Sequence, residues 1–155
     1  MRFESLTEVL DFAIEKEIEA AAFYEEVSRP ESMSGAKEML LEFAQEEKKH
    51  RRLLEDLKNT GMVDGISEYA FKWIPDIKRS DFVVEMEYRK GMTYNELLML
   101  AMKREEKALK LYNQLQNQAE DENSKNLFKM LCQEEAKHKL ALETTYDDYM
   151  ARMGD

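Results

Sequence analysis

The chain has 155 residues and a mass of 18.3 kDa, which is enough for one domain with a substantial core and no disulfides. Glycine (5) and proline (2) are scarce, so the composition disfavours frequent turns and favours helices. The formal net charge of −10 opposes binding to polyphosphate backbones, which excludes nucleic acid as an expected partner. We therefore expect a single all-α domain spanning residues 1–155.

The N-terminal stretch MRFESLTEVLDF carries charges before any apolar run could act as a signal peptide. No stretch of the sequence approaches the roughly 18 apolar residues of a membrane span. We expect a cytoplasmic protein that does not bind membranes. Cys132 is the single cysteine, so it permits no internal disulfide and no four-thiolate metal site, and we expect it to pack as a small apolar side chain.

The first predicted helical hairpin covers residues 5–59. Ser5 and Glu8 form an S/T-x-x-E capping box, which predicts a helix from about residue 5 to about residue 29. The apolar stripe of this helix has the spacing of a buried face and contains Leu6, Leu10, Ala13, Ile14, Ala20, Ala21, Tyr24 and Val27. Glu17 lies inside the stripe. The returning helix begins near residue 35, and Glu47 and His50 fill the middle of its own apolar stripe.

A connecting segment, residues 60–92, follows the first hairpin. Roughly 11 extended residues would span a helix of this length, so the segment can cross from one end of a bundle to the other. A structureless loop of this size is unusual in a compact domain. We therefore expect a short helix near residues 67–73, and we expect Trp73 to cap the core.

The second predicted hairpin, residues 93–150, repeats the first at an offset of 88 positions. Thr93 and Glu96 form its capping box. The fragments QEEKKH and QEEAKH end at the two histidines of the chain and differ in one letter. The offset aligns three pairs of ionisable residues inside apolar stripes: Glu17 with Glu105, Glu47 with Glu135, and His50 with His138.

Six ionisable side chains on buried helix faces require a compensating charge. Burial of a carboxylate costs free energy, and four ionised carboxylates also repel one another. Two histidines supply too few cationic charges, whereas neutral imidazole is itself a metal ligand. A glutamate and a histidine at i and i+3 point to the same side of a helix, and mixed oxygen and nitrogen donors suit iron or manganese. The pattern predicts a two-metal site, although any one buried glutamate or histidine is more often a satisfied core residue.

The pattern E-x29-E-x-x-H, present twice over four helical segments, resembles the ferritin-like di-iron carboxylate superfamily. The stretches LEFAQEEKKHRRLLEDL and LAMKREEKALKLYNQL are most similar to the rubrerythrin di-iron domain. The resemblance covers nearly the whole chain outside the connecting segment. It implies a four-helix bundle with a long crossover between helices 2 and 3, holding two iron ions, or manganese ions, per chain.

The resemblance also implies a role for each candidate residue. Glu17 and Glu105 would be terminal ligands and Glu47 and Glu135 would bridge the metals, while His50 and His138 would each cap one metal. Tyr24 and Tyr112 would donate hydrogen bonds to the ligands. Packing in the core is the alternative role for both tyrosines.

Two departures from the family pattern limit what can be carried over. Ala108 stands where rubrerythrins usually have an extra glutamate, and one cysteine cannot form a rubredoxin module.

We expect an oxidoreductase that reduces hydrogen peroxide or dioxygen in oxidative stress, with electrons from a separate donor such as rubredoxin. A ferroxidase in iron handling and a structural, metal-bound interaction bundle remain alternatives. A homodimer or small homo-oligomer is expected, and the basic stretch KKHRR around His50 is interpreted as a solvated flank.

Overall fold

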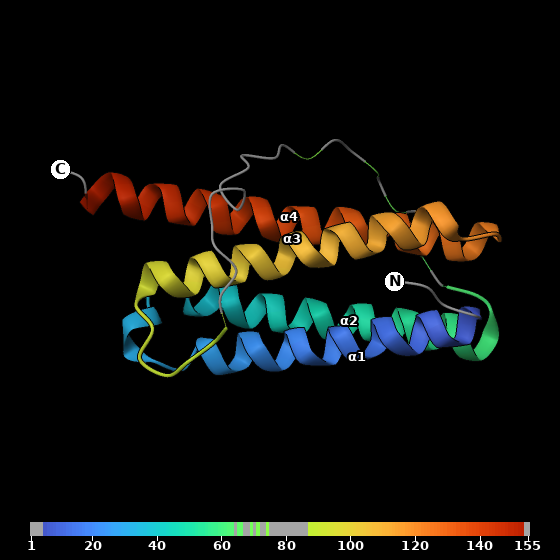
Figure 1. The fold of residues 1–155 in the computed structure, drawn as a ribbon, viewed down its shortest axis with the longest axis horizontal. Coiled ribbons are helices and arrows are strands. Elements are labelled where there is room, and N and C mark those ends of the chain that lie inside the picture. The colour runs from blue at the N-terminus through green and yellow to red at the C-terminus, as the bar shows by residue number, and fades with distance from the viewer. Residues whose placement is uncertain are drawn as a thin grey trace. The chain divides into compact units, whose positions relative to one another are not determined.

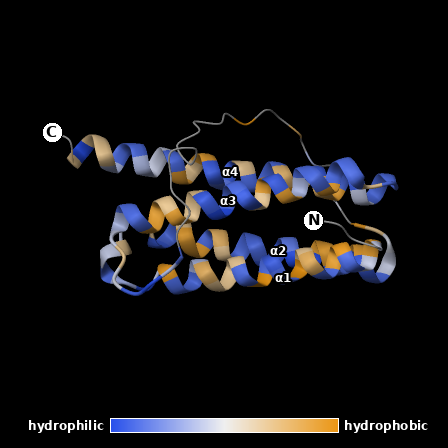
Figure 2. Cartoon of the chain, in the orientation of Figure 1, coloured by the Kyte–Doolittle hydropathy of each residue, from blue (hydrophilic) through white to orange (hydrophobic). Residues whose placement is uncertain are grey.

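The computed structural model describes residues 5–63, 65–66, 69, 71, 74 and 87–153. Four α-helices lie in these residues: α1 (Leu6–Val27), α2 (Lys37–Thr60), α3 (Tyr94–Gln118) and α4 (Glu122–Met153), with a short 3-10 helix, η1 (Glu31–Met33), between the first two (Figure 1). No strand occurs among them. The all-α prediction is confirmed, and hydrophobic and hydrophilic residues alternate along the helices as amphipathic packing requires (Figure 2).

The chain divides into two compact units. The first contains Met1–Tyr69 and Leu115–Phe128, and therefore holds α1, α2 and the turn between α3 and α4. The second contains Ala70–Gln114 and Lys129–Asp155, and holds most of α3 and α4. The expectation of a single domain over residues 1–155 stays a prediction.

In the first unit, α1 and α2 form an antiparallel hairpin. The Ser5 hydroxyl accepts a hydrogen bond from the Glu8 amide (3.1 Å), so the predicted cap at the start of α1 is confirmed. Along the hairpin the Tyr24 ring meets Phe43 edge to face, with 5.5 Å between ring centroids. Most of the predicted stripe of α1 is buried, although Ile14 and Ala20 are only partly so. Leu6 is 44% exposed, so its predicted burial was wrong. Leu6 is the first residue of the helix, where a neighbouring helix covers less of its surface.

The C-terminus of α2 is capped by two hydrogen bonds of Gly61. Gly61 has φ +75°, a left-handed conformation that suits glycine, and its amide donates to the Leu57 carbonyl (2.9 Å). The Gly61 carbonyl accepts from the Asn123 side-chain amide, also at 2.9 Å. Within the first unit, the beginning of α4 is therefore fastened to the end of α2.

In the second unit, α3 and α4 run antiparallel. Thr93 and Glu96 form the complete capping box, because the Glu96 amide donates to the Thr93 hydroxyl (3.3 Å) and the Thr93 amide donates to the Glu96 carboxylate (3.0 Å). The hydrogen bond from the Thr93 backbone, with the bond from its side chain and the Arg89 charge, lowers the pKa of Glu96. The rings of Tyr94 and Tyr149 pack at 4.7 Å. Both predicted hairpins are thus present, with boundaries close to those expected.

Residues 61–93 connect α2 to α3, in agreement with the predicted crossover. The short helix expected near residues 67–73 falls largely on residues outside the described ranges, and so does Trp73. None of the described helices is both long enough and apolar enough to span a membrane.

Candidate metal centre

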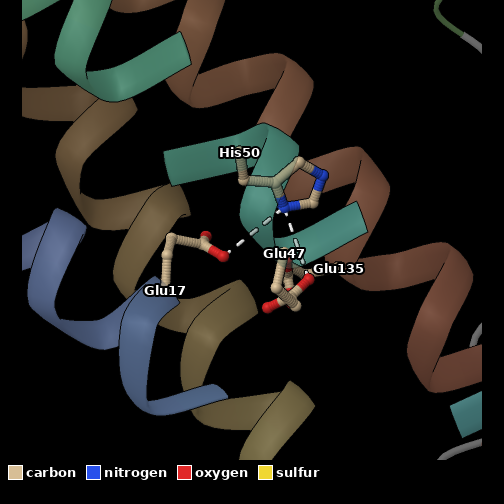
Figure 3. Close-up of side chains that lie close together, drawn as sticks. All are labelled: Glu17, Glu47, His50 and Glu135. Atoms are coloured by element: carbon tan, nitrogen blue, oxygen red, sulfur yellow. Dashed lines mark ion pairs between the residues drawn. The ribbon is translucent and has the colours of Figure 1, made fainter. Parts of the chain in front are cut away.

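The first cluster of ionisable side chains lies in the α1–α2 hairpin. Glu17 comes from α1, and Glu47 and His50 come from α2, one turn apart; all three are buried. His50 Nδ1 lies 3.6 Å from Glu17 Oε2 and 3.3 Å from Glu47 Oε1 (Figure 3). One ligand atom from each residue lies within 4.8 Å of the other two. These three side chains, predicted from the interrupted apolar stripes, do meet inside the hairpin.

The two carboxylates of the first cluster change the pKa of His50. Burial lowers the pKa of His50, but hydrogen bonds and the charges of Glu17 and Glu47 raise it more, so the pKa lies well above the ordinary 6.5. In the metal-free cluster a protonated His50 therefore offsets part of the charge of the two carboxylates. A bound cation would replace that proton, because a ligating imidazole is neutral.

The second cluster lies in the α3–α4 hairpin and repeats the first. Glu105 comes from α3, and Glu135 and His138 come from α4; all three are buried. His138 Nδ1 lies 3.6 Å from Glu105 Oε1 and 3.9 Å from Glu135 Oε2. Ligand atoms of these residues also lie within 4.8 Å of one another. The offset of 88 positions in the sequence thus corresponds to the same local geometry in space.

The donor set of each cluster fits a hard or borderline divalent metal ion. Two carboxylates and one imidazole supply oxygen and nitrogen ligands with enough negative charge to compensate one such ion. A thiolate is absent from both clusters, because the Cys132 thiol points to the Leu109 carbonyl (3.6 Å) and burial raises its pKa. Each unit therefore carries a buried three-residue group that could hold one metal ion.

Tyr24 and Tyr112 are almost fully buried, each with 1% of its surface exposed. Tyr24 packs its ring against Phe23 (5.3 Å between centroids) and Phe43, so a packing role is established for it. The predicted role of both tyrosines as hydrogen-bond donors to the ligands stays a prediction. The same holds for the division of the glutamates into terminal and bridging ligands.

A buried ion pair next to the second cluster was not predicted. Lys139 follows His138 directly, and its ammonium lies 3.2 Å from Glu143 Oε1, with side-chain exposures of 6% and 0%. The repeat aligns this pair with Arg51 and Glu55 of α2, which are 47% and 39% exposed. The alignment was visible in the sequence, but a Lys and a Glu at i and i+4 are typical of a solvated helix face.

Comparisons with known proteins agree with this geometry. A family model described as Rubrerythrin matches residues 8–146. A solved structure of a hypothetical protein from Pyrococcus furiosus is 31% identical, with a TM-score of 0.68 over 92% of this chain and 89% of that chain. No curated protein matches the sequence significantly. The matched region contains both clusters.

Proposed function

The chain belongs to the rubrerythrin family, and from this premise we propose that it is a non-haem di-iron oxidoreductase that reduces hydrogen peroxide or dioxygen. Family membership makes the fold a ferritin-like four-helix bundle, as predicted. A peroxidase or oxidase of this kind removes reactive oxygen species in the cytoplasm. Its electrons come from a separate donor protein.

The observation that supports the proposal is the repeated buried cluster of two glutamates and one histidine. Together the clusters supply four carboxylates and two imidazoles, which matches the ligand set of ferritin-like di-metal proteins. Two ferrous ions, when bound, supply the two electrons that convert peroxide to water. A purely structural role would not require six buried polar ligands, because an apolar core of the same volume is often at least as stable.

We assign the roles of individual residues from the family resemblance. Glu17 on α1 and Glu105 on α3 would each be a terminal ligand of one metal. Glu47 and Glu135 would bridge, and His50 and His138 would each present Nδ1, the atom that faces the carboxylates in both clusters. Buried Tyr24 and Tyr112 would exclude water and orient the carboxylates.

The test loads the full chain anaerobically with ferrous iron and then mixes it with peroxide or dioxygen in a stopped-flow instrument. We expect about two iron ions per chain, and consumption of about one equivalent of peroxide before the reaction stops for lack of a donor. Glu47→Gln/Glu135→Gln should lose the iron. Glu46→Gln/Glu134→Gln is the matched control, because it makes the same change one position earlier in both repeats, and it should keep the iron.

Three results would contradict the proposal. Retention of both irons by the Glu47→Gln/Glu135→Gln variant would show that these carboxylates are not ligands. Uptake of many irons per chain, together with a cage-sized assembly in size-exclusion chromatography, would favour iron storage instead. A loaded protein that reacts with neither oxidant would leave the metal with a structural role.

A further inference from the structure

A basic face covers the outside of α2 directly behind the first cluster. It consists of Lys48, Lys49, Arg51 and Arg52, the four residues that flank His50. Lys49 and Arg52 are exposed and make no ion pair with any residue that the structure describes, while His50 points into the core. Lys48 and Arg51 remain 44% and 47% exposed and pair with Glu25 and Glu55. Two unpaired positive charges thus stand at the surface of a chain whose net charge is −10.

The second repeat lacks this basic face, although it keeps every ligand. At the 88-residue offset Lys49 becomes Lys137, which pairs with Glu134 at 2.8 Å. Arg52 becomes Leu140, which lines an apolar hollow together with Ile74. Arg51 becomes Lys139, which is buried against Glu143. At the aligned positions α4 thus carries an ion-paired lysine, a leucine and a buried lysine. The two unpaired charges on α2 are therefore not a by-product of the ligand pattern that the two repeats share.

We propose that the basic face of α2 is the docking surface for a small acidic protein that carries one electron. The inference rests on the proposed function, since it names the entry point for the electrons that restore the metals. A negatively charged carrier is repelled by most of this acidic molecule and attracted at this face, so its approach is steered to one side. Transient electron-transfer complexes bury little surface and depend on such charge complementarity.

The location of the face suits electron delivery. Lys49 and Arg51 are the chain neighbours of His50, so only the width of α2, on the order of 10 Å, separates a docked carrier from the first cluster. One turnover converts one hydrogen peroxide, two electrons and two protons into two waters. Two successive encounters with a one-electron carrier supply the electrons, and each carrier leaves oxidised. A weak, fast-dissociating complex is what this cycle requires.

The test measures how fast a reduced acidic rubredoxin reduces the oxidised, iron-loaded full chain. The readout is the loss of ferric absorbance. Charge reversal in Lys49→Glu/Arg52→Glu should lower the second-order rate constant at least ~10-fold at low ionic strength. The rate constant of the neutral Lys49→Gln/Arg52→Gln variant should lie between those of the wild type and the charge-reversal variant. The difference should fade near 1 M salt, where the Debye length is only about 3 Å.

The matched control is Arg29→Glu/Lys37→Glu, which makes the same change in net charge at two exposed residues, one in the α1–α2 connection and one at the start of α2. It should keep the wild-type rate. Reduced methyl viologen, a small cation, should reduce every variant at least as fast as it reduces the wild type. This result would show that the iron and the fold are intact in the variants. Thermal melts check folding independently.

The outcomes separate this inference from the proposed function. Equal slowing in the control, no slowing in the Lys49→Glu/Arg52→Glu variant, or no reduction of the wild type by the acidic carrier would each overturn the docking proposal. Failure of the proposed function appears elsewhere, as a pre-reduced wild type that does not consume peroxide or dioxygen. Reduction of the iron by the carrier is measurable in either case.

Discussion

The two hairpins carry the same ligands in different surroundings. In both, a glutamate from the first helix meets a glutamate and a histidine from the second, with histidine-to-carboxylate distances between 3.3 and 3.9 Å. Behind the histidine, α2 presents a solvated Arg51–Glu55 pair, whereas the corresponding Lys139–Glu143 pair of α4 is buried. The local geometry of the cluster is thus the same in both hairpins, while the residues behind the histidine differ in burial.

The largest expected effect tests whether the two clusters are equivalent. Glu17→Ala and Glu105→Ala each remove one carboxylate from one cluster. Because loss of a residue that only supports a ligand already weakens metal binding 10–100-fold, loss of the ligand itself should weaken it by at least about 100-fold. Iron analysis after dialysis should therefore fall from about two to about one ion per chain in both variants. Loss of both irons from only one of the variants would show that the clusters fill in a fixed order.

A second comparison concerns the aligned ion pairs. Lys139→Met takes away the ammonium that faces the buried Glu143 carboxylate, and it should lower the free energy of unfolding by about 3–5 kcal/mol. Arg51→Met disrupts an exposed pair and should cost less than about 1 kcal/mol. Urea denaturation of the metal-free proteins gives both values.

The double variant Lys139→Met/Glu143→Leu is the control for this comparison. Removing both charges also removes the desolvation cost, so the double variant should recover most of the stability that the single variant loses. Equal costs for Lys139→Met and Arg51→Met would show that the α4 pair is solvated.

The pH dependence of stability should reveal the first cluster in the metal-free protein. The folded-state pKa of His50 lies above its unfolded value, so its stabilising contribution is complete below pH 6.5 and is lost as the pH rises through the folded pKa. Urea denaturation from about pH 6 upward should show this decline, and His50→Gln should make it smaller. Iron affinity should rise over the same pH window, because binding displaces the proton. A profile identical in wild type and His50→Gln would contradict the coupling.

The smallest expected effect compares the two helix caps. Thr93→Ala removes the hydroxyl that accepts from the Glu96 amide and donates to the Glu96 carboxylate, and it should cost about 1–2 kcal/mol. Ser5→Ala removes a side-chain acceptor and should cost about 0.5–1 kcal/mol. Thermal unfolding of both variants measures the difference. A larger cost for Ser5→Ala would mean that the start of α1 contributes more to stability than its one cap bond indicates.

The sequence predicted the helices and the members of each cluster because both depend on helical period. Glu17, Glu47 and His50 interrupt apolar stripes, so the helical period places them on the buried faces of their helices. The second repeat shows the same pattern, which makes the prediction stronger. The burial of Lys139 was not predictable, since Lys139–Glu143 and Arg51–Glu55 have the same spacing and differ only in what covers them. The exposure of Leu6 has a similar origin, because periodicity gives the face of a residue but not how far neighbouring helices extend along it.

The hydrogen bond from Asn123 to Gly61 joins positions 62 residues apart and closes a long loop in the first unit. Loop-closure entropy grows slowly, by only about 0.6 kcal/mol per doubling of length. Insertions in the 61–93 connection, which lies inside this loop, would therefore add little to the entropic cost of closing it. Local hairpin contacts form before such a distant one in most folding reactions. The Asn123 contact therefore acts late, and its loss would speed the unfolding of the chain more than it slows the folding.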